Sequence, residues 1–362
     1  MTAIVQTSSE CNLQCKYCYV HASVGSIKKR MSIDDLDVCI RNISFGFDDV
    51  RLCWHGGEPL LMGLDFYRAA LDVQRKIKLI NGTKFYNSMQ TNGLLLNDEW
   101  MNFFKENKFS VGVSFDAPPD VNASQRACGM GKVSDGYIFE ISKLFKKYQL
   151  PFNVLCVVSK ENVSRSEEIF NFFDSIGVNS YSLLLMMKTS LEGCPDCPTN
   201  EELFDAYKTT FDMWLKGGHK FKAIDPIYTM VKSLLGKTMP GLCSFGNHCL
   251  IRMATITPDG NVVPCGSFIS DEYVLGNIKN DSLLKILSDK QCRHFRQKRE
   301  ICIADKCRDC EFVSICRGGC REVAFWHTGT YDGAYPYCEA RKKTFSYIRE
   351  RLNEELKKTR QS

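Results

Sequence analysis

The stretch Cys11-Asn12-Leu13-Gln14-Cys15-Lys16-Tyr17-Cys18-Tyr19 places three cysteines in a C-x3-C-x2-C run, shortly after the apolar segment Ala3–Thr7. Three thiolates on one short loop can bind three irons of a 4Fe–4S cube and leave the fourth iron open to a ligand. The spacing differs from the paired C-x2-C of zinc ribbons, where four ligands close a tetrahedral site. Incidental or zinc-bound cysteines remain the alternative.

Short apolar runs alternate with amphipathic stretches from residue 3 to residue 190. The expected strands are Ala3–Thr7, Val50–His55, Lys84–Gln90, Ser110–Phe115, Phe152–Val158 and Tyr181–Met186. The expected helices between them are Ser32–Ile43, Leu64–Ile80, Asp98–Glu106, Asp135–Tyr148 and Ser164–Ile176. This alternation predicts an α/β fold, a partial (β/α)6 TIM-like barrel with helices outside a parallel sheet. Reactive groups would gather at the C-terminal ends of its strands.

The sequence changes character after the sixth expected strand. Two helical stretches, Asn200–Leu215 and Pro226–Leu235, lead into a cysteine-rich region with a hairpin signal at Pro258–Asn261. The segment Glu339–Lys358 is charged and periodic and reads as a closing helix. We therefore expect a barrel over 1–195, a helical bridge over 196–240, a small cysteine-rich domain over 241–340 and a C-terminal helix over 341–362.

Nineteen cysteines are many for a chain of 362 residues. No apolar run reaches the ~20 residues that span a bilayer, and the N-terminus lacks the features of a secretory signal. We therefore expect a cytoplasmic protein without a membrane partner, in which such cysteine density indicates metal or redox chemistry. The net charge of +5 is dispersed along the chain, so no nucleic-acid partner is expected.

A second set of cysteines follows residue 240 at regular spacings. Its members are Cys243, Cys249, Cys265 (after Gly260-x4), Cys307, Cys310, Cys316, Cys320 and Cys338. Eight thiolates suit two fully ligated cubes. A pair of zinc sites is the alternative, because C-x2-C is also a zinc spacing. Cys194 and Cys197 form another C-x2-C after the sixth strand, for which a chance loop pair, a redox pair and a substrate-facing thiol all stay open.

The motif Gly56-Gly57-Glu58-Pro59 follows the second expected strand, where bare glycine backbone would allow a ligand to approach closely. Together with the cysteine triad, it resembles the radical S-adenosylmethionine (SAM) superfamily, and most of all the anaerobic sulfatase-maturating branch with its C-terminal SPASM domain. The resemblance extends to the stretches Gln90–Gly93, Val111–Asp116 and Phe152–Val158.

This resemblance implies the site residues. The implied SAM contacts are Tyr17, Gly57, Glu58, Ser114, Arg126 and Met187. Arg126 could instead be a solvated loop residue, and Met187 a core residue at a strand end. Cys11, Cys15 and Cys18 would hold the SAM cluster; Cys243, Cys249, Cys265 and Cys320 the first auxiliary cluster; and Cys307, Cys310, Cys316 and Cys338 the second. The implied cofactors are three 4Fe–4S clusters and SAM, with flavodoxin or ferredoxin as electron donor.

One position departs from the maturase pattern. The branch carries an aspartate directly after the hairpin cysteine, as the base that deprotonates the target cysteine or serine, whereas this chain has Gly266 after Cys265. The tyrosine that the branch places two residues after the third cysteine is replaced by Val20. Asp271 or Glu272 could substitute as the base, although exposed loop acids are the simpler interpretation. The catalytic base is therefore unassigned.

Three functions follow as hypotheses. The first is a radical SAM oxidoreductase that oxidises or crosslinks a residue of a ribosomal peptide, with no appended leader-binding domain expected. The second is formation of Cα-formylglycine on a sulfatase by a displaced base. The third is a non-catalytic iron–sulfur electron-transfer protein, against which the intact Gly56–Pro59 motif argues.

Overall fold

The computed structural model describes residues 1–20, 28–128, 136–187, 193–217, 221–237, 243–245, 249–268 and 271–361. The chain forms two compact units that interleave along the sequence. Unit 1 comprises Met1–Ser114, Ala123–Phe152 and His248–Gln297, and unit 2 comprises Phe115–Asn122, Asn153–Asn247 and Lys298–Ser362. These units are defined by contacts between residues and not by segments of the sequence. The domain limits expected from sequence at 195, 240 and 340 stay predictions.

Unit 1 is built on a mostly parallel sheet. Strands β1 (Thr2–Ser8), β3 (Asp49–Gly56), β4 (Lys84–Thr91) and β5 (Ser110–Ser114) pair in parallel in that order. β10 (Met253–Ile256) joins the other edge of β1 in parallel, followed by antiparallel β11 (Asn261–Val263) and β12 (Gly276–Asn277). The hairpin of β10 and β11 thus covers the free edge of β1, which would otherwise expose unpaired backbone groups.

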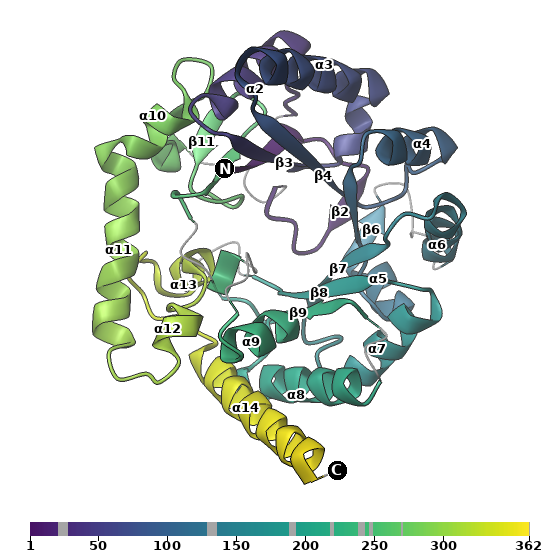
Figure 1. Cartoon of the computed structure of the whole chain (residues 1–362), viewed down its shortest axis with the longest axis vertical. Coiled ribbons are helices and arrows are strands. Elements are labelled where there is room, and N and C mark those ends of the chain that lie inside the picture. Colours follow the sequence, from purple (N-terminus) through teal and green to yellow (C-terminus); the bar gives the residue numbers. More distant parts are fainter. Residues whose placement is uncertain are drawn as a thin grey trace. The chain divides into compact units, whose positions relative to one another are not determined.

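The helices of unit 1 are α2 (Ile33–Ser44), α3 (Leu64–Asn81), α4 (Asp98–Glu106), α6 (Tyr137–Tyr148) and α10 (Leu283–Ser288), with the 3-10 turns η1 (Pro59–Met62) and η3 (Asp271–Tyr273). α2 and α3 pack side by side (Figure 1). The hydroxyl of Ser32 caps α2 by accepting a 3.0 Å hydrogen bond from the backbone N–H of Asp35. Asp135, where the sequence places the start of α6, lies outside the described residues.

Unit 2 contains the parallel strands β7 (Asn153–Val158), β8 (Ser180–Leu185) and β9 (Ala223–Asp225). Its helices are α7 (Ser166–Ser175), α8 (Asn200–Lys216), α9 (Ile227–Leu234), α12 (Val313–Cys316), α13 (Arg321–Thr328) and α14 (Cys338–Gln361), with the turn η2 (Cys243–Phe245). The units share α5 (Pro119–Gln125) and α11 (Lys290–Lys306). A capping box of Thr199 and Glu202 starts α8, which packs against α14 (Figure 1).

All six strands expected in the alternating region exist, each within one residue of its predicted limits. The expected helices in that region and after it also form, with ends shifted by no more than three residues. Among the described residues, no helix is both long enough and apolar enough to cross a membrane.

Candidate active site and iron–sulfur sites

The N-terminal cysteine triad lies on one loop of unit 1. Strand β2 (Leu13–Cys15) pairs antiparallel with β6 (Arg126–Cys128), which sets Cys15 opposite Arg126. The backbone N–H of Cys18 donates to the carbonyl of Cys15 at 3.1 Å, and that of Leu13 donates to Cys11 Sγ at 3.3 Å. Burial raises the pKa of the Cys11 thiol to about 11, and the neighbouring Glu58 and Cys18 act in the same direction. A bound iron would hold this sulfur as a thiolate.

The Gly56–Pro59 motif at the end of β3 is hydrogen-bonded to the backbone segment that precedes the cysteine triad. The backbone N–H of Gly57 donates to Ser8 O, and that of Glu58 donates to Glu10 O, both at 2.7 Å. A Cβ on Gly57 would lie 2.0 Å from Glu10 O. The glycine is therefore required by the close approach of this protein's own backbone, in addition to any ligand.

The Glu58 carboxylate is buried and accepts three hydrogen bonds. The donors are the Thr91 hydroxyl at 2.7 Å, the Asn92 N–H at 2.8 Å and the Leu60 N–H at 3.0 Å. Burial raises its pKa to about 7, although these donors pull the pKa down. The side chain thus ties the end of β3 to the end of β4, and its predicted contact with SAM stays a prediction.

Five of the six predicted SAM contacts lie in unit 1: Tyr17, Gly57, Glu58, Ser114 and Arg126. Arg126 is 7% exposed, and its guanidinium carbon lies 5.6 Å from the centroid of the Tyr17 ring. This burial argues against a solvated loop arginine. Ser114 Oγ, at the end of β5, accepts a 2.8 Å hydrogen bond from Gln90 Nε2.

The sixth predicted contact, Met187, lies in unit 2. It is half-buried and lies two residues after Leu185, the last residue of β8. Its predicted contact with adenine stays a prediction.

Tyr19 is a site residue that the sequence analysis missed. A Cβ on Gly266 would lie 2.9 Å from the Tyr19 hydroxyl oxygen and 3.1 Å from its ring carbon Cε2. The residue after Cys18 therefore packs on the residue after Cys265, and Tyr19 fills the space that a side chain at position 266 would need. No local pattern could have revealed this contact, because the two residues are far apart in the sequence.

His55 was also missed, although it directly precedes the Gly56–Pro59 motif. Gln6 is its register partner on β1, and strand alternation places it on the opposite face of β3 from the buried Trp54. Its Nδ1 accepts a 2.7 Å hydrogen bond from the backbone N–H of Gly56, and burial lowers its pKa to about 4. The ring is therefore neutral at pH 7, with its proton on Nε2.

The four cysteines predicted for the second auxiliary cluster line one cavity of unit 2: Cys307, Cys310, Cys316 and Cys338. Among the described residues, no three metal-binding side chains meet closely enough for a single ion. A space ringed by four thiols suits a multi-iron cube better than a zinc ion. Cys302 also lines the cavity, but its thiol lies 3.4 Å from the carbonyl of Gly333.

The cysteines predicted for the first auxiliary cluster come from both units. Cys249 and Cys265 belong to unit 1, where Cys265 follows β11; Cys243 and Cys320 belong to unit 2, where they start η2 and cap α13. Each is half-buried. Their joint ligation of one cluster stays a prediction.

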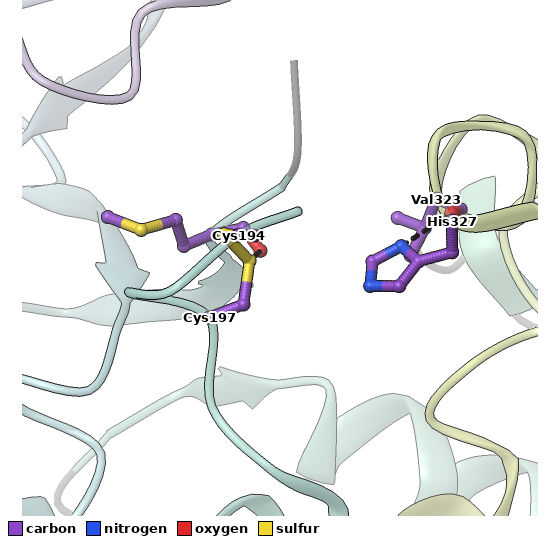
Figure 2. Close-up of a disulfide and its surroundings, with 5 residues drawn as sticks. Cys194, Cys197, Val323 and His327 are labelled. Atoms are coloured by element: carbon purple, nitrogen blue, oxygen red, sulfur yellow. Dashed lines mark hydrogen bonds between the residues drawn. A yellow bond between two sulfur atoms is a disulfide. The ribbon is translucent and has the colours of Figure 1, made fainter. Parts of the chain in front are cut away.

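The Cys194–Cys197 pair in unit 2 forms a disulfide, so neither is a free thiol in this structure (Figure 2). Cys197 Sγ lies 3.3 Å from the carbonyl oxygen of Met186, close to the end of β8. Figure 2 also shows His327 of α13, whose Nδ1 lies 3.0 Å from the carbonyl oxygen of Val323. The disulfide excludes a free substrate-facing thiol at either position in this structure.

Comparisons with known proteins identify two family domains and several relatives. Residues 5–173 match the radical SAM superfamily, and residues 243–311 match the SPASM iron–sulfur cluster-binding domain. The chain is 29% identical to the cysteine-type anaerobic sulfatase-maturating enzyme of Clostridium perfringens strain 13, over 96% of both chains. It is 28% identical to the serine-type enzyme of Bacteroides thetaiotaomicron, over 93% of this chain and 86% of that one.

Solved structures show the same likeness. The native anSMEcpe structure with bound AdoMet and Cp18Cys peptide superposes with a TM-score of 0.86 at 26% identity, over 98% of both chains. Streptococcus suis SuiB bound to precursor peptide SuiA shares the fold, with a TM-score of 0.65 at 15% identity over 92% of this chain and 74% of that one.

The fold and the matches define an iron–sulfur enzyme of the radical SAM superfamily, which uses a 4Fe–4S cluster and SAM. Within that superfamily, the chain carries a SPASM domain, which binds auxiliary iron–sulfur clusters, and is homologous to the anaerobic sulfatase-maturating enzymes. The predicted α/β barrel-type fold with a SPASM domain is confirmed. The hypothesis of a non-catalytic electron-transfer protein is wrong, because the chain matches enzymes over almost its whole length.

Proposed function

We propose that this enzyme modifies a peptide or protein other than a sulfatase, by oxidising or crosslinking one of its residues as a maturase of ribosomal peptides. The observation that carries this proposal is the contact between Tyr19 and Gly266. The position at which sulfatase maturases are expected to carry a basic aspartate has no side chain, and a phenol occupies its space. The structure of anSMEcpe with bound Cp18Cys peptide supports a peptide substrate.

The residues present fit the cofactors. Cys11, Cys15 and Cys18 would hold the SAM cluster, and the buried Arg126 beside Tyr17 would meet an anionic or aromatic part of SAM. When bound, the cluster and SAM together supply a 5′-deoxyadenosyl radical that abstracts a hydrogen atom from the substrate. The protein's own residues position the ligands and exclude water.

Neither Tyr19, which packs on Gly266, nor the buried His55 replaces the missing aspartate as a base. The phenol of Tyr19 carries an O–H donor and lacks the negative charge of a carboxylate, so it does not replace the aspartate as a base. His55 carries its proton on Nε2, while its Nδ1 is occupied by the Gly56 N–H. The arrangement therefore suits a radical reaction that needs no deprotonation of a thiol or hydroxyl by residue 266.

Formylglycine formation is the second candidate, because two named maturases align over more than nine-tenths of this chain. It would need another base. Asp271 and Glu272 are both exposed in η3, which makes them poor candidates for a site that excludes water. We further propose flavodoxin or ferredoxin as the electron donor, and a cytoplasmic location stays a prediction.

The test is incubation of the reconstituted, reduced enzyme with SAM and a sulfatase-derived peptide that contains C-x-P-x-R. The proposal expects 5′-deoxyadenosine without an aldehyde product, as read by mass spectrometry. Efficient conversion of the cysteine to formylglycine would overturn it in favour of the second candidate.

A further inference from the structure

The Arg341 side chain is a buried cation in unit 2, as are those of Arg299 and Arg321. It is 6% exposed, and among the described residues no aspartate or glutamate forms an ion pair with it. A charged group removed from water without a counter-charge costs several kcal/mol on general grounds. The protein must therefore neutralise this guanidinium in another way.

The guanidinium lies against two aromatic rings. Its carbon lies 4.0 Å from the centroid of Phe245 and 4.4 Å from that of Tyr335. Cation–π attraction stabilises such an arrangement but does not cancel a full charge. The three residues come from η2, the segment before α14 and α14 itself, so the pocket is built by the tertiary fold.

The same guanidinium points toward the four-cysteine cavity. Its Nη1 donates to Cys316 Sγ at 3.6 Å and to the carbonyl of Ser244 at 3.1 Å. Lys306 and Lys342 also line the cavity, and no acidic residue is among the described residues that line it. A cube ligated by four thiolates is anionic, so its charge would supply the missing counter-ion.

We propose that Arg341 is a positioning residue of the second auxiliary cluster, and that its charge and its hydrogen bond to Cys316 raise the reduction potential of that cluster. This inference rests on the proposed ligand set of Cys307, Cys310, Cys316 and Cys338. Positive charge and hydrogen bonds to ligand sulfurs both favour the reduced cluster, which is one charge more negative. Arg341 thereby makes the cluster a better acceptor for an electron that leaves the substrate.

The test is a redox titration of the full-length, reconstituted protein, followed by electron paramagnetic resonance. The second auxiliary cluster is identified as the signal that disappears in Cys310→Ala. In Arg341→Met this cluster should be at least tenfold less reduced at a fixed potential, which corresponds to a shift of about 59 mV to more negative values. Arg341→Lys keeps the charge and should recover most of the loss.

Arg349→Met is the matched control, because Arg349 lies on the same helix over the ring of Phe312 but is exposed and pairs with Glu311. It should leave the potential unchanged. If Arg341→Met does not retain the cluster, Arg341→Gln replaces it in the same comparison.

An unchanged potential in the neutral Arg341 variants, or a shift no larger than that of Arg349→Met, overturns the role of Arg341 and leaves the ligand assignment intact. If no signal disappears in Cys310→Ala, the ligand assignment itself is wrong, and the inference falls with it.

Discussion

The side-chain amide of Asn92 donates a 2.7 Å hydrogen bond to the Asn12 side chain, while its backbone N–H donates to the Glu58 carboxylate. The same amide lies 3.8 Å from Cys11 Sγ. One residue at the end of β4 thus connects the cysteine loop to the Gly56–Pro59 motif. These two sequence motifs therefore belong to a single hydrogen-bonded structure.

We expect Glu58→Gln to destabilise the protein. The carboxylate accepts hydrogen bonds from three donors, and the amide of glutamine would turn its own N–H₂ group toward one of them. A buried donor without an acceptor costs about 1–3 kcal/mol. Glu99→Gln is the control, because Glu99 is exposed in the first turn of α4. Anaerobic thermal unfolding measures both, and equal midpoints for the two variants would refute the role of Glu58.

Gly57→Ala should displace the segment that leads into the cysteine triad, because its Cβ would meet the backbone oxygen of Glu10. We expect the loss of about four irons per chain, the content of one cluster. In Gly112→Ala the added Cβ meets only the movable end of the Gln90 side chain, so iron content should stay near that of the wild type. Iron analysis after reconstitution decides, and full iron content in Gly57→Ala would contradict the argument.

The stability of the protein should depend on His55 at mildly acidic pH. Its folded-state pKa of about 4 lies below the unfolded value near 6.5, so only the unfolded chain gains a proton between these values. His55 therefore lowers stability as the pH falls through this window, on the order of 1 kcal/mol between pH 7 and 5.5.

The His55→Gln variant should lose this part of the pH dependence. His294→Gln, which alters an exposed histidine of α11, should keep it. Unfolding free energies measured at several pH values test this. Parallel pH profiles for the wild type and His55→Gln would show that the pKa of His55 does not differ between the folded and the unfolded state.

Restoring an aspartate at position 266 should not by itself produce a sulfatase maturase. Tyr19 occupies the space that the new side chain needs, so Gly266→Asp alone should yield little formylglycine from a C-x-P-x-R peptide. Tyr19→Ala combined with Gly266→Asp should yield at least roughly tenfold more, since the whole ring is gone. Tyr19→Phe with Gly266→Asp is the matched control and should gain less, because the ring remains. The explanation fails if Gly266→Asp alone equals the double variant.

Much of the fold could be predicted from local patterns in the sequence. Apolar periodicity located the strands and helices. The edge pairing of β10 with β1 could not be predicted, because the hydrophobic pattern of a strand does not name its partner. The contact of Tyr19 with Gly266 and the packing of Phe245 and Tyr335 on Arg341 could not be predicted either. Both join residues that are not neighbours in the sequence.

The most direct test of the central claim is whether the reduced protein cleaves SAM at the N-terminal triad. The full-length enzyme, reconstituted anaerobically with iron and sulfide and reduced with dithionite, is incubated with SAM, and 5′-deoxyadenosine is quantified by chromatography. We expect the wild type to form this product and a Cys11→Ala, Cys15→Ala, Cys18→Ala triple variant with its other clusters loaded to form none. Absence of 5′-deoxyadenosine from the loaded wild type, or equal amounts from both proteins, would contradict the account.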